Sequence, residues 1–332
     1  MARHLTYLLL LTTLGACSQT NAPEMKKEDP LLCDIETGTC GVPPSSTQGS
    51  VNDAPLLPTA GYPITIQYFT DPICSSCWGI EPQLRRLKAE YGTVVHVEYH
   101  MGGLVPDWNG FNSGGISKPS DVASHWDEVG HHYNMPIIGD VWLEDPLASS
   151  YPPSIAFKAA ELQDRDLALS FLRRMREMVF MEKRNIARPE VINEAAAQVG
   201  LDTTRLASNM KGAGLALFNA DLALARASGV RGFPTMLLSN AEGQRQVVYG
   251  SRPYAQIVEA LRQLSPGLSS AARPSSVKDL FTLHPGWCAQ EAAIMLDISP
   301  AEATLQLDLL IKRGELERYD TRNGAIWRKP RT

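Results

Sequence analysis

Two cysteines separated by two serines, Cys74 and Cys77, are the residues of this chain whose types and spacing best suit chemistry. They stand between an apolar run that is typical of a buried strand and an amphipathic run that is typical of a helix. At a helix N-terminus the free backbone N–H groups and the helix dipole favour a thiolate, so we expect a lowered pKa at Cys74. Cys77 lies one turn further along, where its thiol can close a small disulfide ring and release a mixed disulfide. The motif predicts thiol–disulfide exchange, with Cys74 as the nucleophile and Cys77 as the resolving thiol.

A CxxC pair can also be half of a zinc site. The sequence contains no second C-x-x-C, which disfavours zinc. His125, His131 and His132 lie in one helix-like stretch, but the first is six residues from the second, which is not the i, i+3 or i, i+4 spacing of a metal site. We therefore expect no metal site and no cofactor.

A second pair of cysteines, Cys33 and Cys40, lies upstream, and the Thr-Gly at its centre would let the chain turn so that the two thiols meet. Three interpretations stay open for this pair. It can form a local structural disulfide, or act as a second redox pair that relays electrons to or from Cys74 and Cys77. It can also bind a metal, with Asp34 and Glu36 as helpers.

The elements that must position Cys74 and Cys77 follow in the order strand, helix, strand, helices, hairpin, helix. The predicted strands are Ile64 to Phe69, Val94 to Tyr99, Thr235 to Leu238 and Gln246 to Tyr249. The predicted helices beside them are Trp78 to Tyr91 and Tyr254 to Leu264, and a long helical stretch separates the two halves. A parallel start followed by an antiparallel pair is the thioredoxin pattern, so we expect an α/β thioredoxin fold with a helical insertion.

The sequence Gly229-Val-Arg-Gly-Phe-Pro234-Thr235 precedes the predicted hairpin. Together with the strand, the CxxC at a helix start and the insertion, it resembles the DsbA-type thioredoxin-fold oxidoreductases over roughly Tyr62 to Leu264. The segments Asp71 to Trp78 and Gly102 to Leu104 are most similar to the FrnE-like branch and the related ClpXP adaptor proteins. The resemblance implies that Pro234 is cis and lies against the active disulfide. It also implies that Phe233, Pro234 and Thr235 bind substrate, with Phe233 offering main-chain groups to an extended peptide.

The chain departs from this family pattern at two places. Many DsbA-type sites have Pro-His between the cysteines, whereas Ser75-Ser76 supplies hydroxyls and no charge. We therefore expect weaker thiolate stabilisation and more moderate oxidising power. Family members often have a buried carboxylate on the preceding strand, but this strand offers Gln67 and Tyr68, and only Asp71 or Glu81 could substitute.

The N-terminal residues have the layout of an export signal, with Arg3 and His4 before the apolar run Leu5 to Leu14. The run is shorter than the ~20 residues that span a bilayer. It ends in Leu14-Gly-Ala-Cys17, which resembles the lipobox of bacterial lipoproteins, where cleavage leaves the cysteine as the acylated first residue. An ordinary secretory signal is the alternative, and both predict export. Ser18 differs from the Asp that retains lipoproteins at the inner membrane, so we expect a periplasmic protein anchored through Cys17, with the outer membrane favoured.

These patterns divide the chain into five segments. We expect a lipoprotein signal peptide, a flexible tether that contains the Cys33 and Cys40 pair, and a DsbA-like thioredoxin domain with a helical insertion. A linker rich in Ser, Pro and Ala and a small winged-helix-like domain follow. The respective boundaries are 1–16, 17–61, 62–265 (insertion about 104–228), 266–274 and 275–332.

The formal net charge of -5 is too acidic for a general nucleic-acid binder. The winged-helix-like segment has as many Asp and Glu residues as Lys and Arg residues, whereas phosphate binding requires a positive face. We therefore expect no nucleic-acid partner. The remaining cysteine, Cys288, has apolar neighbours that predict a buried structural thiol.

Taken together, the motifs predict an enzyme, an extracytoplasmic protein thiol–disulfide oxidoreductase. It would oxidise or isomerise disulfides in exported proteins through Cys74 and Cys77, and depend on a separate redox recycling partner. Its expected partners are cysteine-containing exported proteins and the membrane. Two alternatives stay open: a non-catalytic adaptor that resembles the ClpXP adaptor branch, and a glutathione-dependent isomerase that resembles the kappa-class transferases. The latter typically carry Ser at the position of Cys74.

Overall fold

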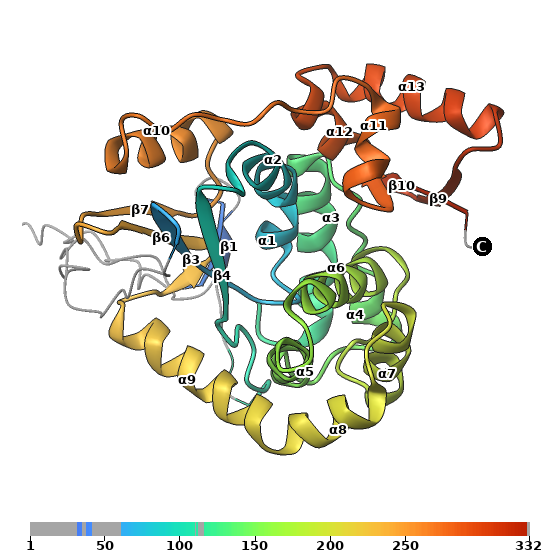
Figure 1. Cartoon of the computed structure of the whole chain (residues 1–332). Helices are drawn as coiled ribbons and strands as arrows, with labels where there is room; N and C mark the ends of the chain where they lie inside the picture. The colour runs from blue at the N-terminus through green and yellow to red at the C-terminus, as the bar shows by residue number, and fades with distance from the viewer. Residues whose placement is uncertain (1–31, 35–37, 42–60, 110, 112–115, 331–332) are drawn as a thin grey trace, which may run out of the picture.

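The computed structural model describes residues 32–34, 38–41, 61–109, 111 and 116–330. Its centre is a four-stranded sheet in the order β4-β3-β6-β7 (Figure 1). The strands are β3 (Ile64–Thr70), β4 (Val95–Met101), β6 (Thr235–Asn240) and β7 (Arg245–Tyr249). β3 pairs with β4 in parallel and with β6 antiparallel, and all seven of its residues are buried. The segment that follows β3, which contains Cys74 and Cys77, therefore begins at a fully buried strand in the middle of the sheet.

The helix predicted after β3 is broken into two pieces. Helix α1 (Ser75–Gly79) contains Cys77, and α2 (Glu81–Tyr91) follows after Ile80, which ends the first helix and begins the second. Proline lacks an N–H and its ring collides with the carbonyl four residues earlier, so Pro82 is accepted only in the first turn of a new helix. The single helix expected from Trp78 to Tyr91 is therefore wrong at its start, for a reason visible at Pro82.

The secondary-structure elements described within the insertion are all helices, joined by loops. Figure 1 shows its helices, green to yellow, to the right of the sheet and below it. They are η2 (Pro119–Asp121), α3 (Val122–Tyr133), α4 (Val141–Glu144), α5 (Tyr151–Glu161), α6 (Arg165–Met181), α7 (Pro189–Gln198), α8 (Thr203–Lys211) and α9 (Ala213–Ala227). Helix α10 (Tyr254–Leu264) packs on β6 and β7 and closes the unit.

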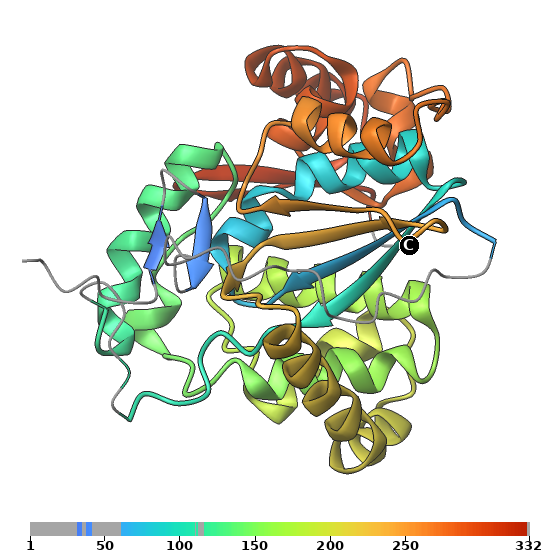
Figure 2. The same cartoon turned by 90° about the vertical axis from the view of Figure 1, so that its left-hand side faces the viewer.

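A second, three-stranded sheet joins distant parts of the sequence. It consists of β1 (Leu32–Asp34), β2 (Thr39–Gly41) and β5 (Gly232–Phe233), in that order and with antiparallel pairing. Figure 2 shows the two N-terminal strands, in blue, at the left end of the central sheet. Two short stretches within the segment expected to be a tether are thus part of the folded structure.

The C-terminal part forms its own sheet, β8-β10-β9, and its own apolar core, which includes Trp287 and Trp327. Its elements are α11 (Val277–Leu283), β8 (Gly286–Cys288), α12 (Ala289–Leu296), α13 (Pro300–Lys312), β9 (Glu317–Thr321) and β10 (Gly324–Arg328). The winged-helix classification of this part stays a prediction.

A buried ion-pair network fastens the C-terminal part to the thioredoxin unit. Glu291 of α12 is fully buried and pairs with Arg173 of α6 at 2.6 Å and with Arg85 of α2 at 3.2 Å. Arg85 also donates to the carbonyl of Gly286 at 2.8 Å and stacks over Trp287. Removal of one partner of a buried ion pair strands the other charge in a site of low dielectric constant.

We expect Glu291→Gln to lower the free energy of unfolding by about 3 to 5 kcal/mol, because it leaves the buried guanidinium of Arg85 and the largely buried guanidinium of Arg173 short of a counter-charge. Urea denaturation of the purified protein measures this change. The matched control is Glu317→Gln on the exposed strand β9, which should change the stability by less than about 0.5 kcal/mol. Equal effects of the two substitutions would contradict the role of Glu291.

Candidate redox site

Cys74 sits at the start of helix α1, as its sequence position predicts. It is the N-cap residue, with φ -72° and ψ 110°, and its Sγ accepts a hydrogen bond from the backbone N–H of Cys77 at 3.2 Å. Both cysteines are free thiols and neither has any exposed surface. The structure therefore places the two thiols of the motif together, at a helix N-terminus and away from solvent.

The loop before β6 meets Cys74 from the other side. The peptide bond between Phe233 and Pro234 is cis, and the Cys74 thiol donates to the carbonyl of Phe233 at 3.7 Å. The ring of Phe233 packs against Gly102, where a Cβ atom would lie only 1.8 Å from the ring, so this position has no room for a side chain. Thr235 donates its hydroxyl to the carbonyl of Gly232 at 2.7 Å and so braces the loop.

The two thiols have opposite pKa shifts. Burial raises the pKa of Cys74 well above the usual thiol value, and its hydrogen bond to Cys77 raises it further. Burial also opposes the charged form of Cys77, but the hydrogen bond from Cys74 and the charge of Arg176 lower the pKa of Cys77 below its usual value. The expectation of a lowered pKa at Cys74 is therefore wrong for this arrangement, because burial outweighs the helix N-terminus.

Arg176 is a member of the site that the sequence did not reveal. It lies on α6, far from the motif in sequence, and is 1% exposed. It donates to the hydroxyl of Thr70 at 2.7 Å and to the carbonyl of Asp71 at 3.3 Å, and it pairs with Glu81 at 3.3 Å. This pairing gives Glu81 a structural partner, and no pattern within the insertion helices marks Arg176 in advance.

Asp71 is the carboxylate nearest in sequence to the motif, and it is completely buried. Its oxygens accept hydrogen bonds from the backbone N–H groups of Ile73 at 3.0 Å and Leu104 at 2.8 Å, and from the hydroxyl of Ser150 at 2.9 Å. These donors and the charge of Arg176 oppose the effect of burial, which nevertheless raises the pKa of Asp71 to about 6. Asp71, rather than a residue within β3, supplies a buried titratable carboxyl group here.

Cys40 belongs to the same apolar cluster as Cys74, Cys77 and Phe233. It is 1% exposed and disulfide-bonded, and the residue opposite it in the β1–β2 pair is Cys33. A disulfide leaves no thiolate at Cys40 for a metal, so the metal-binding interpretation is wrong for this residue. The choice between a structural and a redox role stays open at this point.

Cys288 is buried and free, as expected. Burial raises the pKa of its thiol well above the usual value, with Glu291 adding to the shift. A buried thiol with a raised pKa is expected to be unreactive.

The lipidation site predicted at Cys17 lies outside the described residues, as does the whole predicted signal peptide. Within the described ranges, no helix is both long and apolar enough to cross a membrane.

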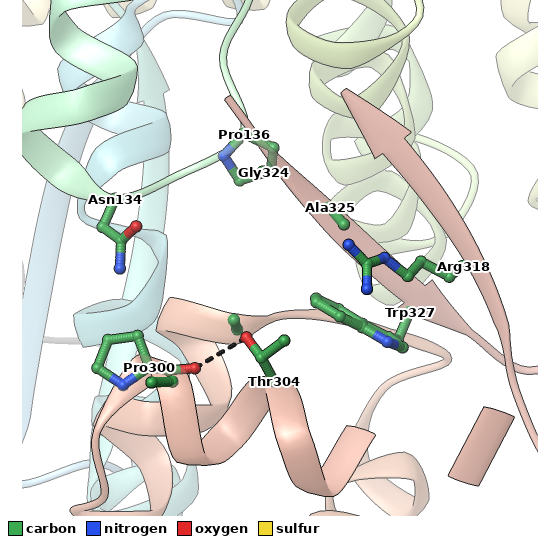
Figure 3. A pocket seen from close by; sticks show the side chains of 10 residues that line it. Asn134, Pro136, Pro300, Thr304, Arg318, Gly324, Ala325 and Trp327 are labelled. Atoms are coloured by element: carbon green, nitrogen blue, oxygen red, sulfur yellow. Dashed lines mark hydrogen bonds between the residues drawn. The ribbon is translucent and has the colours of Figure 1, made fainter. Parts of the chain in front are cut away.

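A cavity of about 320 Å³ lies between the thioredoxin unit and the C-terminal part (Figure 3). Its lining includes Asn134 and Pro136 on one side and Pro300, Thr304 and Trp327 on the other. It is linked to the motif through Trp78, whose indole N–H donates to the carbonyl of Pro136 at 3.2 Å. None of the cysteines in the described part of the chain lines the cavity, so it is separate from the redox site.

Comparison with known proteins agrees with this architecture. A family model described as thioredoxin matches residues 68–259. The ClpXP adapter protein SpxH of Halalkalibacterium halodurans is 33% identical over 273 residues, which cover 80% of this chain and 89% of that protein. SpxH of Bacillus subtilis is 28% identical over 274 residues, with 80% and 89% covered.

Two solved structures share the fold. The cytosolic disulfide reductase DsbM from Pseudomonas aeruginosa matches with a TM-score of 0.50 and 26% identity, covering 60% of this chain and 100% of that one. A protein from Nitrosomonas europaea matches with a TM-score of 0.51 and 20% identity, covering 60% and 95%, and shows the fold alone. The expected DsbA-like thioredoxin fold is confirmed. The chain belongs to the thioredoxin family, and its relatives within that family include the ClpXP adapter proteins SpxH.

Proposed function

We propose that this protein is an extracytoplasmic thiol–disulfide oxidoreductase that acts on cysteine-containing exported proteins through Cys74 and Cys77. The observation that carries the proposal is the pair of free thiols at the start of α1, with Cys74 in hydrogen-bond contact with the carbonyl of Phe233. Thiols paired at a helix start can be oxidised to a disulfide and reduced again. The DsbA-like fold supports a redox role of this kind.

In the oxidising direction, a client thiolate attacks Cys74 Sγ of the Cys74–Cys77 disulfide, and Cys77 leaves as a thiolate. A second client thiolate then attacks the client sulfur of the mixed disulfide, and Cys74 leaves. The client gains one disulfide, and the pair gains two electrons and two protons. In the isomerising direction, the Cys74 thiolate attacks a client disulfide and leaves again after the client has rearranged.

The charge of Arg176 suits the first of these steps. Cys77 is the leaving group when Cys74 is attacked, and a leaving thiol with a lower pKa departs faster. Arg176 lowers the pKa of Cys77 from within the protein, where burial otherwise opposes the thiolate. Arg176 thus places a positive charge beside the leaving thiol, where Ser75 and Ser76 between the cysteines supply none.

The location outside the cytoplasm and the lipid on Cys17 are part of the proposal. They rest on the apolar N-terminal run and on the Leu14-Gly-Ala-Cys17 sequence. Disulfides persist in that compartment, so clients with paired cysteines are available there.

We expect Cys74→Ser to slow the oxidation of a two-cysteine fluorescent peptide by the pre-oxidised protein by at least about 100-fold, because a serine hydroxyl cannot replace the exchanging sulfur. The matched control is Cys288→Ser, which removes the buried thiol outside the site and should keep the wild-type rate. The rate is followed by the fluorescence change on peptide cyclisation. A Cys74→Ser variant as active as the wild type would overturn the proposed function.

A second candidate, a non-catalytic adaptor, is favoured by the similarity to SpxH, which extends over 80% of this chain. An adaptor holds its partner without chemistry at the cysteines. Capture of one defined partner that persists in the Cys74→Ser/Cys77→Ser double variant, together with no peptide oxidation by the wild type, would favour the adaptor over the enzyme.

A further inference from the structure

The strand edge beside Cys74 is occupied by the chain itself. Strand β5 directly precedes Pro234, and β2 pairs with it so that Cys40 lies opposite Phe233 and Gly41 opposite Gly232. An extended peptide that adds to a strand edge gains backbone hydrogen bonds and presents its side chains to neighbouring pockets. Phe233 is the residue expected to receive a client peptide in this way. The segment 39–41 therefore takes the position of a client strand.

Contacts outside the strand pair hold this segment in place. The N–H of Ser251 donates to the carbonyl of Gly38 at 2.8 Å, just before β2 begins. Thr39 and Cys40 are 2% and 1% exposed, and β2 packs against helix α1. The segment is thus buried against the redox site, with a cysteine at its centre.

Two contacts bring Cys40 close to the active pair. Its Sγ lies 3.6 Å from the hydroxyl oxygen of Ser76, within the CxxC motif, and Phe233, its partner in the strand register, accepts the hydrogen bond from Cys74. A disulfide sulfur carries no proton, so Ser76 is the donor in the contact with Cys40. The same hydroxyl can donate to Cys40 when that sulfur departs as a thiolate.

Cys33 is the natural partner for the disulfide of Cys40. The two residues face each other across β1 and β2, and the described cysteines other than Cys40 and Cys33 are free. Cα atoms opposite each other in an antiparallel pair are about 4.5 to 5.5 Å apart, within the roughly 4.4 to 6.8 Å that a disulfide spans. The free thiols of Cys74 and Cys77 beside this disulfide are the reactants of an exchange reaction.

We propose that the Cys33–Cys40 disulfide is an internal substrate of the Cys74 and Cys77 pair, so that the N-terminal segment relays electrons to and from the active site; this proposal rests on the proposed function. The Cys74 thiolate attacks Cys40 Sγ, the Cys33–Cys40 bond breaks, and Cys33 leaves and takes up a proton. The Cys77 thiolate then attacks Cys74 Sγ, and Cys40 leaves and takes up a proton. Two electrons pass from the active pair to the N-terminal pair, the two protons come from the Cys74 and Cys77 thiols, and no external reagent is needed.

The mixed disulfide between Cys74 and Cys40 can be trapped in the Cys77→Ser variant, which lacks the resolving thiol. The purified variant, with Cys33–Cys40 oxidised, is incubated with N-ethylmaleimide, which caps Cys33 each time it leaves. Proteolysis before Asp34, Asp53 and Asp71 then places Cys33, Cys40 and Cys74 in three separate peptides for mass spectrometry.

We expect the Cys40 peptide to be linked to the Cys74 peptide, with Cys33 alkylated. The yield should not change on about tenfold dilution, since an intramolecular reaction has a fixed effective concentration. Cys74→Ser, with Cys77 intact, is the control that should give no such link. An intact Cys33–Cys40 link, with Cys74 still a free thiol when the protein is unfolded in acid, would contradict the relay.

A kinetic comparison of the wild type, which has the Cys74 and Cys77 pair, with a variant that lacks both thiols gives an independent test. Glutathione should reduce Cys33–Cys40 at least about tenfold more slowly in the Cys74→Ser/Cys77→Ser variant than in the wild type, because it must then attack the disulfide directly, without the neighbouring thiols. Cys288→Ser should keep the wild-type rate. Equal rates in the wild type and the double variant would overturn the relay.

The peptide oxidation assay separates the relay from the proposed function. If the relay fails both tests while the wild type still oxidises the peptide, Cys33–Cys40 is a structural disulfide and the enzymatic function stands. If the wild type neither oxidises the peptide nor reduces its own N-terminal disulfide, both proposals fail together.

Discussion

Replacing Gly38 by valine is expected to raise the alkylation rate of Cys74 in the native protein by about 10- to 100-fold. Gly38 has φ +63°, and an added Cβ would lie 2.4 Å from Cβ of Ser251 and 2.8 Å from the hydroxyl of Tyr133. A non-glycine residue in this region of backbone space costs roughly 1 to 3 kcal/mol before any collision is counted. The valine therefore destabilises the state in which the segment 38–41 packs against the redox site. The segment should leave this position more often, which exposes Cys74 to the reagent.

The rate is measured by pulse labelling with a charged maleimide and tandem mass spectrometry, which separates Cys74 from Cys77. Buried Cys288 serves as the internal reference, and its labelling should stay slow in both proteins. Gly243→Val is the matched control, since Gly243 also has positive φ (+79°) but an added Cβ would meet nothing within 4 Å. The same labelling rate of Cys74 in Gly38→Val and in the wild type would show that the segment does not protect the site.

The opening of the segment should also change the acidity of Cys74. Burial is the largest cause of its raised pKa, and an open segment returns the thiol toward solvent. The pH at which Cys74 labelling reaches half its maximum should therefore be lower in Gly38→Val than in the wild type. The backbone N–H of Cys77 already donates to Sγ of Cys74. With less burial to oppose it, the helix N-terminus would then lower the pKa of Cys74, as the sequence suggests.

This dependence on a distant segment explains which parts of the site the sequence could reveal. The position of Cys74 at a helix start follows from local patterns, because a strand, a CxxC and an apolar helical stretch adjoin one another in the chain. The pairing of Cys40 with Phe233 joins residues that are far apart in sequence, and the short strand β2 carries no periodicity of its own. Local patterns therefore located the thiols, but could not show what covers them.

The electrostatics of the site were hidden for a similar reason. Arg176 reaches Thr70 and Asp71 only because α6 of the insertion packs beside the end of β3. An arginine on a helix is more often exposed than buried, so nothing in the sequence of α6 marks it. The succession of strands and helices along the chain and the closing hairpin, by contrast, were predictable, because the patterns that indicate them lie within each segment. The break at Ile80 could have been found from Pro82 alone.

Asp71 leads to an expected pH dependence of stability. Its pKa is raised from 3.8 to about 6 by burial, so the folded protein binds this proton more tightly than the unfolded chain does. The free energy of unfolding must therefore fall as pH rises from about 4 to 6, by about 3 kcal/mol from this group alone. Above that window Asp71 is charged in both states, and the loss is complete.

Asp71→Asn should abolish this part of the pH dependence, because asparagine does not titrate. Urea denaturation at several pH values between about 4 and 7 measures the difference in slope between wild type and variant. Asp166→Asn, at an exposed position on α6, is the matched control and should keep the wild-type slope. An unchanged slope in Asp71→Asn would show that another group carries the dependence.

Ser150→Ala provides the complementary test if Asp71→Asn folds poorly. Ser150 donates to the carboxylate at 2.9 Å, and this donation lowers the pKa of Asp71 against the effect of burial. Loss of the hydroxyl should raise the pKa of Asp71 above 6. The free energy of unfolding should then still fall as pH rises, but over a range that extends to higher pH. If the pH range over which stability falls moved down instead, Ser150 would stabilise the protonated form of Asp71. The hydroxyl would then not act as a donor to the carboxylate.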